Sequence, residues 1–283
     1  PLSGKGLIKE HLVNIVDIMT KAGYKITIYP TQCQGDAIKK VRKKAKKYDL
    51  VVCSGGDGTL DEVVTGMEQS EVNVPIGYIP AGSTNDFANS LGIPKDMEEA
   101  AKVAVSGTPF PCDVGGFNGD TFVYVAAFGL FTEVSYQTSQ QMKNILGHAA
   151  YILEGAKHLM DITSYMKVTH DGEIIEDEFI YGMVTNSLSV GGFKGISGPD
   201  VLLDDGLFEV TLIKMPKNPI ELNKILVGLT NRENDNELIY SFKTSELKVE
   251  SGEEVPWTLD GEFGGAHTDL TISNLNKQIT IMC

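Results

Sequence analysis

The spacing of apolar residues changes near residue 110, and this change divides the chain into two parts. In the first part, three helix-like patterns alternate with three short apolar runs. The helix-like patterns cover residues 6–23, 35–48 and 59–70, and the apolar runs cover residues 24–31, 49–56 and 75–82. Strands that alternate with helices of this length are typical of βα units with a parallel sheet. We therefore expect an N-terminal α/β domain.

Period-two alternation dominates the second part, where Asp-Gly and Asn-Gly pairs mark hairpin turns. The expected strands lie within residues 109–129, 164–186, 206–215, 244–251 and 269–283, and helical inserts are expected near residues 143–160 and 219–230. This pattern predicts an antiparallel, β-sandwich-like domain. We place the domains at residues 1–115 and 116–283, with the extreme C-terminus as a candidate to return to the first domain.

Composition limits the classes of partner. The chain has 283 residues, of which 42% are hydrophobic, and this is enough for a sizeable core and two domains. The formal net charge of −14 argues against nucleic acid as a partner. The four cysteines lack CxxC or metal-ligand spacing, so we expect reduced thiols in a cytosolic protein. The longest nearly apolar run, FVYVAAFGLF, is about half the ~20 residues of a spanning helix, so any membrane contact is expected to be peripheral and cytoplasmic.

A glycine-rich turn follows an apolar run in the stretch VVCSGGDGTLDEVV. Backbone N–H groups at a strand-to-helix turn are unpaired and lie at the positive end of the helix dipole, so they attract phosphate. Gly55, Gly56 and Gly58 allow a close approach. Asp57 would repel a phosphate unless a cation lay between them, and Mg²⁺ prefers such oxygen ligands. The alternative is a tight turn in which Asp57 only caps the helix, and this motif alone does not decide between the two.

The stretch IPAGSTNDFANSLGIP repeats the design about twenty residues later. A strand ends at Pro80, and Asn85 and Asp86 open a helix. Neighbouring strands of a parallel sheet end at the same edge, where α/β proteins bind ligands. Ser83 can donate a hydrogen bond to a phosphate, and Asp86 can join the cation or face the acceptor. For Asp86 alone, helix capping is again the alternative.

These two motifs, together with LDGEFGG much later, resemble the family of soluble bacterial diacylglycerol kinases and lipid kinases. That family shares its catalytic core with sphingosine, ceramide and eukaryotic diacylglycerol kinases, and the resemblance covers nearly the whole chain. GGDGT also occurs in NAD kinases and phosphofructokinases, whereas NDFA with a late DGE is more specific. The resemblance implies an NAD-kinase-like N-terminal domain. It also implies ATP-dependent transfer of a phosphoryl group to a lipid hydroxyl, with diacylglycerol favoured and Mg²⁺ as the cation.

By match to the family, the resemblance implies which residues contact ATP. They lie in the N-terminal SGK loop, in the GGDGT turn with its helix, and at two single positions: Ser3, Gly4, Lys5, Thr31, Gly55, Gly56, Asp57, Gly58, Thr59, Leu60, Asp61 and Ser83. Lys5 would act as a point charge near the phosphates. The stretch LLDDGLF resembles a structural Mg²⁺ site made by the Asp205 carboxylate and the carbonyls of Leu202 and Leu207. A plain turn between strands is the alternative there.

The resemblance assigns the general base to the LDGE motif, at Asp260 or Glu262, and Asp57 and Asp86 complete the catalytic set. Residues i and i+2 of a strand share a face, so we expect both late carboxylates on the same side of a strand that Trp257 anchors. The pattern does not decide which of them takes the proton. A hairpin turn with an exposed Asp-Gly pair is the alternative.

Three other functions remain open. The acceptor can be another lipid, such as a sphingoid base or phosphatidylglycerol. The protein can be an NAD kinase, although that leaves NDFA and DGE unexplained. It can also be a non-catalytic lipid-binding pseudokinase, because the family's first strand does not precede PLSGKG here. The expected partner is a lipid at a membrane surface, and only the resemblance suggests a homodimer.

The run KKVRKKAKK, residues 39–47, carries seven cations in nine residues. Ile38, Val41 and Ala45 share one face, so the run is an amphipathic helix with a basic outer side. A solvated helix surface is the plainer interpretation. The sharper one is a patch for anionic lipid headgroups.

Overall fold

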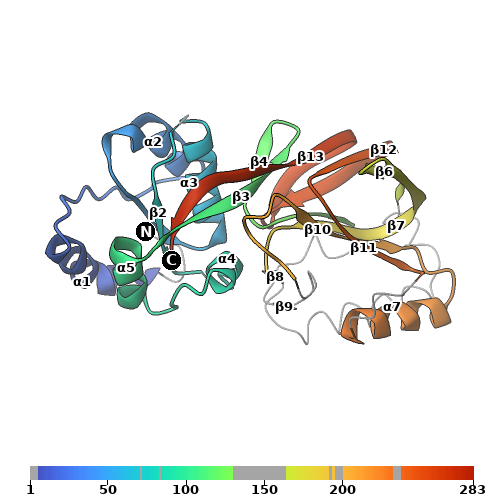
Figure 1. The fold of residues 1–283 in the computed structure, drawn as a ribbon, viewed down its shortest axis with the longest axis horizontal. Coiled ribbons are helices and arrows are strands. Elements are labelled where there is room, and N and C mark those ends of the chain that lie inside the picture. The colour runs from blue at the N-terminus through green and yellow to red at the C-terminus, as the bar shows by residue number, and fades with distance from the viewer. Residues whose placement is uncertain are drawn as a thin grey trace. The chain divides into compact units, whose positions relative to one another are not determined.

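The computed structural model describes residues 6–70, 72–82, 84–129, 164–190, 193–194, 200–231 and 237–283. The chain divides into two compact units. Unit 1 consists of Pro1–Val114 and Leu275–Cys283, and unit 2 consists of Gly115–Asn274. The last strand therefore begins in unit 2 and ends in unit 1 (Figure 1).

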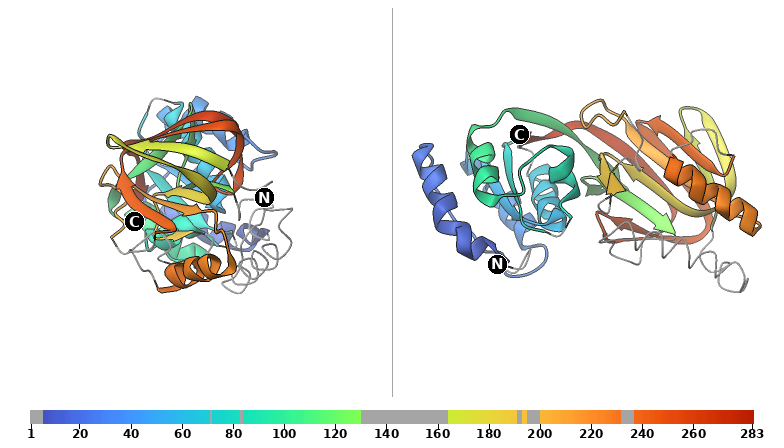
Figure 2. Two further views of the ribbon diagram at one scale, coloured as in Figure 1. Left: turned by 90° about the vertical axis from the view of Figure 1, so that its right-hand side faces the viewer. Right: turned by 90° about the horizontal axis from the view of Figure 1, so that it is seen from below.

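Unit 1 consists of helices around short strands. In chain order its elements are α1 (Ile8–Lys21), α2 (Asp36–Lys44), a 3-10 turn η2 (Ala45–Lys47), β1 (Val51–Gly55), α3 (Asp57–Glu68), β2 (Ile76–Pro80), α4 (Asp86–Ser90), α5 (Met97–Ser106) and the first part of β3 (Pro109–Phe117). Helix α5 packs against β2 and contacts α1, whereas α3 packs against β1 and contacts α2 (Figures 1 and 2). The three expected helices and the strands at β1 and β2 are confirmed.

Local sequence explains several of these boundaries. Gly23, with φ of 91°, follows the end of α1, because glycine adopts this left-handed conformation without strain. Asp96 begins α5 by accepting hydrogen bonds from Glu98 N and Glu99 N, both at 3.0 Å. A residue of α3 holds the start of α2: the Glu62 carboxylate accepts hydrogen bonds from the N–H groups at positions 35 and 37.

Strand β2 of unit 1 has parallel neighbours on both sides. β1 pairs with β2 from Val51↔Ile76 to Gly55↔Pro80, and β2 pairs with the end of β13 at Ile281. The other pairings whose register is defined are antiparallel. A two-part α/β and β-rich fold is therefore confirmed, whereas an NAD-kinase-like parallel sheet is not.

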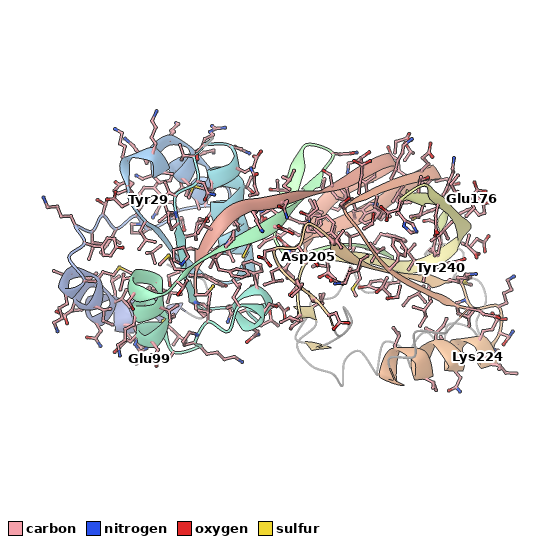
Figure 3. The ribbon with its side chains drawn as sticks, viewed as in Figure 1. Tyr29, Glu99, Glu176, Asp205, Lys224 and Tyr240 are labelled. Carbon is pink, nitrogen blue, oxygen red and sulfur yellow. The ribbon has the colours of Figure 1, made fainter. Side chains whose placement is uncertain are left out.

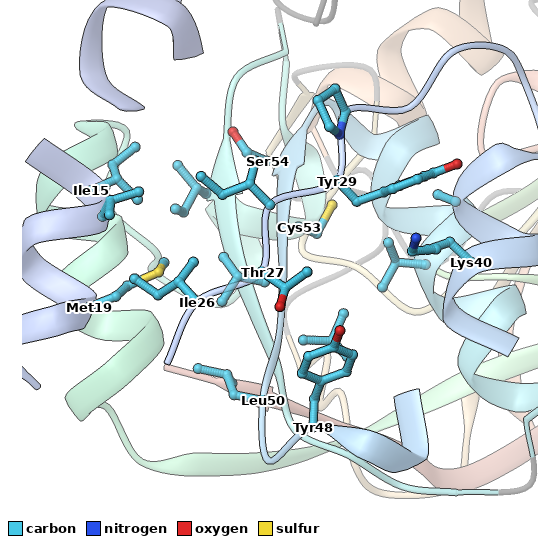
Figure 4. A pocket seen from close by; sticks show the side chains of 18 of the residues that line it. Ile15, Met19, Ile26, Thr27, Tyr29, Lys40, Tyr48, Leu50, Cys53 and Ser54 are labelled. Atoms are coloured by element: carbon cyan, nitrogen blue, oxygen red, sulfur yellow. The ribbon is translucent and has the colours of Figure 1, made fainter. Parts of the chain in front are cut away.

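The expected strand at residues 24–31 does not form. These residues have no regular secondary structure and pair with no strand. They line a largely apolar cavity of about 570 Å³, which α1, α2 and β1 also border (Figure 4). An extended segment becomes a strand only when a neighbouring strand pairs with its backbone N–H and C=O groups. Residues 24–31 border the cavity and have no such paired strand. Alternation alone predicted the strand and could not predict the missing partner.

Unit 2 is an antiparallel β structure. Its elements are the end of β3, β4 (Asp120–Phe122), β5 (Val125–Gly129), β6 (Ser164–His170), β7 (Glu173–Thr185), β8 (Ser189–Val190), β9 (Phe193–Lys194), β10 (Phe208–Lys214), α7 (Pro219–Asn231), β11 (Ile239–Thr244), β12 (Glu246–Leu259) and most of β13 (Glu262–Met282). Strands β12 and β7 each pair with both β5 and β6. The expected helix at 219–230 is confirmed as α7, and the one near 143–160 lies outside the described residues.

The core of unit 2 surrounds Trp257 on β12, which is 2% exposed. Its ring lies 5.5 Å from the Phe117 ring, edge to face, and 4.8 Å from the Phe128 ring. Such aromatic pairs stabilise a core beyond the area that they bury. Trp257 therefore anchors the end of β12 in the core, as expected.

Candidate functional site

The two glycine turns of unit 1 lie side by side at the carboxyl ends of β1 and β2. Ala81 N donates to Gly55 O at 2.7 Å. A Cβ added to Gly82 would lie 2.7 Å from the Gly56 Cα, so the two backbones are in direct contact. The Tyr78 hydroxyl also donates to Gly55 O at 3.3 Å. The expected juxtaposition of the two turns is confirmed.

Asn85 closes the second turn on itself. It is 7% exposed and has a φ of 52°, a left-handed conformation that asparagine tolerates better than most residues. Its Oδ1 accepts from Gly82 N at 2.8 Å, and its Nδ2 donates to Gly82 O at 3.0 Å. The side chain therefore holds the turn instead of capping α4, which begins at the next residue.

Asp57 links the first turn to the second. Its Oδ2 accepts from Asp86 N at 3.2 Å and from Thr84 Oγ1 at 3.4 Å. Its Oδ1 is buried and receives no hydrogen bond from the described residues. Helix α3 has no side-chain cap at its N-cap residue, Gly56. Asp57 therefore belongs to the paired turns, and the plain capping interpretation does not account for it.

Two carboxylates meet at these turns, those of the half-buried Asp57 and of Asp86. Burial raises the pKa of Asp57 from 3.8 to about 6, and the charge of Asp86 adds to the rise, whereas hydrogen bonds from the second turn oppose it. Asp86 itself is fully buried. A cation bound beside Asp57 would offset both the burial of its charge and its repulsion by Asp86. One or two carboxylates with substrate phosphates are the ligand set that Mg²⁺ commonly takes, so the buried, unbonded Asp57 Oδ1 fits such an ion.

The other residues expected at the nucleotide occupy different positions around the turns. The Thr59 side chain packs against Gly55, since a Cβ added to Gly55 would lie 2.4 Å from the Thr59 Oγ1. Thr59 and Thr31 line the same cavity. Gly58 and Asp61 lie in the first turns of α3, whereas the Leu60 side chain is 1% exposed and belongs to the core. Ser3, Gly4, Lys5 and Ser83 lie outside the described residues.

Asp260 and Glu262 do not share a strand face, contrary to the expectation. Asp260 and Gly261, with φ of 51° and 88°, form the turn between β12 and β13, and Leu259 pairs with Glu262 across it. A turn reverses the chain between them, so the i and i+2 rule for strands does not apply. The Asp-Gly pair is a hairpin turn, but its aspartate is 7% exposed, not surface-exposed.

The Asp260 carboxylate accepts three backbone hydrogen bonds. Val123 N donates to Oδ2 at 2.6 Å, while Tyr124 N and Val125 N donate to Oδ1 at 3.0 and 2.9 Å. These bonds tie the hairpin to the strand β5 and the residues before it. Glu262, at the start of β13, is exposed. The structure therefore gives the two carboxylates different surroundings, which the sequence could not separate.

The turn before β10 contains the carboxylate expected to bind Mg²⁺. Asp205 is labelled in Figure 3. Its Oδ1 accepts from Leu207 N at 3.0 Å, and its Oδ2 lies 3.8 Å from Lys243 Nζ. Lys243 also pairs with Glu209 at 3.1 Å. In the part of the chain that the structure describes, no group of three or more His, Cys, Asp or Glu side chains could hold a metal ion. A site with the carbonyls of Leu202 and Leu207 stays a prediction.

Comparison with known proteins identifies the family. The family described as "Diacylglycerol kinase catalytic domain" matches residues 1–117. The diacylglycerol kinase of Bacillus subtilis (strain 168) is 36% identical over 270 residues, which cover 94% of this chain and 88% of that protein. The chain belongs to the diacylglycerol kinase family. A diacylglycerol kinase of Staphylococcus carnosus is 35% identical, with 99% of this chain and 92% of that protein covered.

Solved structures of the family agree with the fold. The crystal structure of a diacylglycerol kinase from Bacillus anthracis str. Sterne matches with a TM-score of 0.77 and 27% identity, covering 100% of this chain and 93% of that one. Membership in this kinase family makes the protein a phosphotransferase with an alcohol acceptor, and it implies ATP as a substrate. Across the described ranges, no helix is long and apolar enough to cross a membrane.

Sequence reasoning missed three carboxylates of this kinase. Asp113 is fully buried and accepts from Asn276 Nδ2 at 3.0 Å and Lys277 N at 2.7 Å. Glu209 is 5% exposed, and burial raises its pKa to about 7 against the effect of Lys243. Glu62 holds the start of α2. For the first two a signal was present, because each is a single acid within an apolar strand, CDVGG and LFEVTL.

The Asp57→Asn substitution is expected to stabilise the kinase at pH 7 in the absence of Mg²⁺ and nucleotide. Because the folded-state pKa of about 6 exceeds the usual 3.8, the folded protein binds more protons between these pH values, and stability falls as pH rises through them. Asparagine removes this penalty, about 1–3 kcal/mol at pH 7. Urea denaturation at pH 7 and pH 4 measures the gain in the free energy of unfolding. The gain should vanish at pH 4, and a gain independent of pH contradicts the assignment.

Gly82→Ala is expected to lower the free energy of unfolding by about 1–3 kcal/mol, a range typical of overpacking. Its Cβ would lie 2.7 Å from both the Gly56 Cα and the Asn85 Oδ1, so the two turns must separate. Gly252→Ala is the matched control, because a Cβ there meets nothing within 4 Å. Urea denaturation compares the two. Equal stabilities would show that the turns are not in contact.

Proposed function

We propose that this kinase transfers the γ-phosphoryl group of ATP to diacylglycerol and forms phosphatidic acid. The observation that carries the proposal is the pair of touching glycine turns with two carboxylates, the half-buried Asp57 and the fully buried Asp86. The relatives that match nearly the full chain are named diacylglycerol kinases, which supports diacylglycerol as the acceptor.

We assign nucleotide binding to unit 1. The backbone of Gly55, Gly56 and Gly58 can approach phosphates closely, and the N-terminus of the 12-residue helix α3 adds a positive dipole end. Ser3, Gly4, Lys5 and Ser83, which lie outside the described residues, would add donors. Asp57 and Asp86 would hold Mg²⁺, which when bound neutralises negative charge on the phosphates. Without the ion, the negative charges of Asp57 and Asp86 would repel the phosphates of ATP.

We assign the general base to Glu262 of unit 2. Both oxygens of Asp260 already accept backbone hydrogen bonds, so Asp260 is better suited to hold the hairpin. Glu262 directly follows that hairpin and is exposed, so an acceptor hydroxyl can reach it. In the reaction, the hydroxyl oxygen bonds to the γ-phosphorus, the bond from that phosphorus to ADP breaks, and the hydroxyl proton passes to Glu262.

The turn of Asp205 is a second candidate Mg²⁺ site, of structural type, with the carbonyls of Leu202 and Leu207. Lys243 already offers a positive charge to the same carboxylate. An ion there would therefore compete with Lys243. For that reason we assign the Asp205 site no part in phosphoryl transfer.

An acceptor panel tests the proposed function. Labelled ATP and magnesium are offered with diacylglycerol, sphingosine or phosphatidylglycerol in mixed micelles, and separately with NAD. We expect label in phosphatidic acid. Label only in another lipid, or only in phosphorylated NAD, reassigns the acceptor, and no transfer to any of them favours a lipid-binding pseudokinase.

A further inference from the structure

The first residue of β5 holds the hairpin that carries the proposed base. β5 lies between β12 and β7 in the sheet and begins at Val125. Val125 N donates to Asp260 Oδ1 at 2.9 Å, and Val125 O accepts from Asp260 N at 2.8 Å. The orientation of the Val125 backbone therefore affects both the carboxylate and the backbone of Asp260, two residues before Glu262.

The end of β7 contacts the same stretch of backbone. Thr185, the last residue of β7, lies directly opposite Val125 in the pairing of β7 with β5. Its Oγ1 donates to Tyr124 O at 2.7 Å, and Asn186 N donates to the same oxygen at 3.0 Å. Thr185 and Asn186 are fully buried. Solvent water therefore cannot take the place of the Thr185 hydroxyl if that donor is lost.

One peptide group joins the Thr185 contact to the Asp260 contact. The C=O of Tyr124 and the N–H of Val125 belong to the same peptide group, which is planar, so the two cannot rotate independently. The hydroxyl that fixes the direction of this carbonyl therefore also fixes the direction of the N–H that donates to Asp260. Hydrogen bonds linked in this way also polarise one another, so the Thr185 hydroxyl strengthens the bond from Val125 N to the carboxylate.

We propose that Thr185 is a positioning residue for phosphoryl transfer, because its hydroxyl holds the Asp260 hairpin through the peptide group of residues 124 and 125 and so orients Glu262. This inference rests on the proposed function, in which Glu262 is the general base. A base must lie within hydrogen-bond reach of the acceptor hydroxyl, so a small displacement of the hairpin slows proton transfer. A hydroxyl that only stabilised the core would change the stability of the protein and leave kcat of the folded enzyme as it is.

Thr185→Val tests the proposal, because valine keeps the shape of threonine and removes the hydroxyl. We expect kcat for diacylglycerol in mixed micelles to fall about 10–10²-fold, as for a slightly misplaced reacting group. The KM for ATP should stay unchanged, since the nucleotide is assigned to unit 1. Thr185→Ser keeps the hydroxyl and should retain most of the wild-type kcat.

Thr244→Val is the matched control. Thr244 ends β11, is 1% exposed and donates from its Oγ1 to Glu246 O at 2.8 Å. Its substitution removes the same kind of buried bond at the opposite end of β12 from the hairpin. Both valine variants should lower the midpoint of urea denaturation by similar amounts, but Thr244→Val should keep wild-type kcat. Equal losses of kcat in the two variants, or wild-type kcat in Thr185→Val, overturn the proposal.

NMR of the kinase labelled with ¹⁵N-valine measures the effect of Thr185 on the hairpin without any assay of activity. Val123 and Val125 both donate to the Asp260 carboxylate, and Val125 shares its peptide group with the carbonyl that Thr185 contacts. In Thr185→Val the Val125 amide proton should move upfield, as its hydrogen bond weakens, whereas Thr244→Val should leave it in place. An unchanged Val125 signal overturns the proposal. A shifted signal in a protein that phosphorylates no acceptor supports the contact from Thr185 to the hairpin and contradicts only the proposed function.

Discussion

Glu262→Gln is expected to lower kcat for diacylglycerol phosphorylation by about 10²–10⁴-fold, the usual contribution of a general base. Glutamine keeps the size of the side chain but cannot take the hydroxyl proton. The affinity for ATP should stay unchanged, because the nucleotide is assigned to unit 1. Glu262 is exposed, so the free energy of unfolding should change by less than about 0.5 kcal/mol. Initial rates with labelled ATP and urea denaturation measure the two quantities.

Glu253→Gln provides the matched control for this result. Glu253 is an exposed glutamate of β12, and it should keep wild-type kcat. A Glu262→Gln variant with wild-type kcat would remove Glu262 as the base. The role would then return to Asp260 only if a variant at that position were inactive and fully stable.

Asp260→Asn is expected to lower the free energy of unfolding by about 2–4 kcal/mol, because it leaves buried donors without a charged acceptor. The carboxylate accepts from three backbone N–H groups, at positions 123, 124 and 125. An asparagine offers one acceptor oxygen and turns an NH₂ donor toward the remaining N–H groups. Urea denaturation of the variant measures the loss, and activity should fall only as far as the hairpin is displaced.

Asp269→Asn is the control for this effect. Asp269 is an exposed residue of the same strand, β13, and its substitution should change stability by less than about 0.5 kcal/mol. Wild-type stability in Asp260→Asn would mean that the three hydrogen bonds do not hold the hairpin. Full stability with lost activity would instead support Asp260 as the base.

Local pattern predicted the elements that local forces determine. The helix periodicity located α1, α2 and α3, and the glycine turns after β1 and β2 could be expected at one edge because parallel strands end together. The antiparallel pairing of the second part followed from period-two alternation and Asp-Gly turns. These features depend on spacing within a few residues, which a single sequence contains.

Long-range contacts explain what the sequence did not reveal. Residues 24–31 alternate like a strand, but a strand exists only with a partner, and β1 pairs on one edge only within the described residues. The difference between Asp260 and Glu262 depends on N–H groups more than 130 residues earlier in the chain. Asp113 likewise bonds to residues 276 and 277. No pattern of local spacing contains such contacts.

The central claim is that Asp57 and Asp86 hold Mg²⁺ and ATP at the two glycine turns, and calorimetric titration of ATP with and without Mg²⁺ tests it most directly. The wild type should bind ATP much more tightly with Mg²⁺. In Asp57→Asn, which should be folded and more stable at pH 7, the Mg²⁺-dependent gain should fall about tenfold or more, as for a lost charge–ligand contact. The exposed control Asp49→Asn should keep it. Equal ATP affinity in all three proteins, with or without Mg²⁺, would contradict the account.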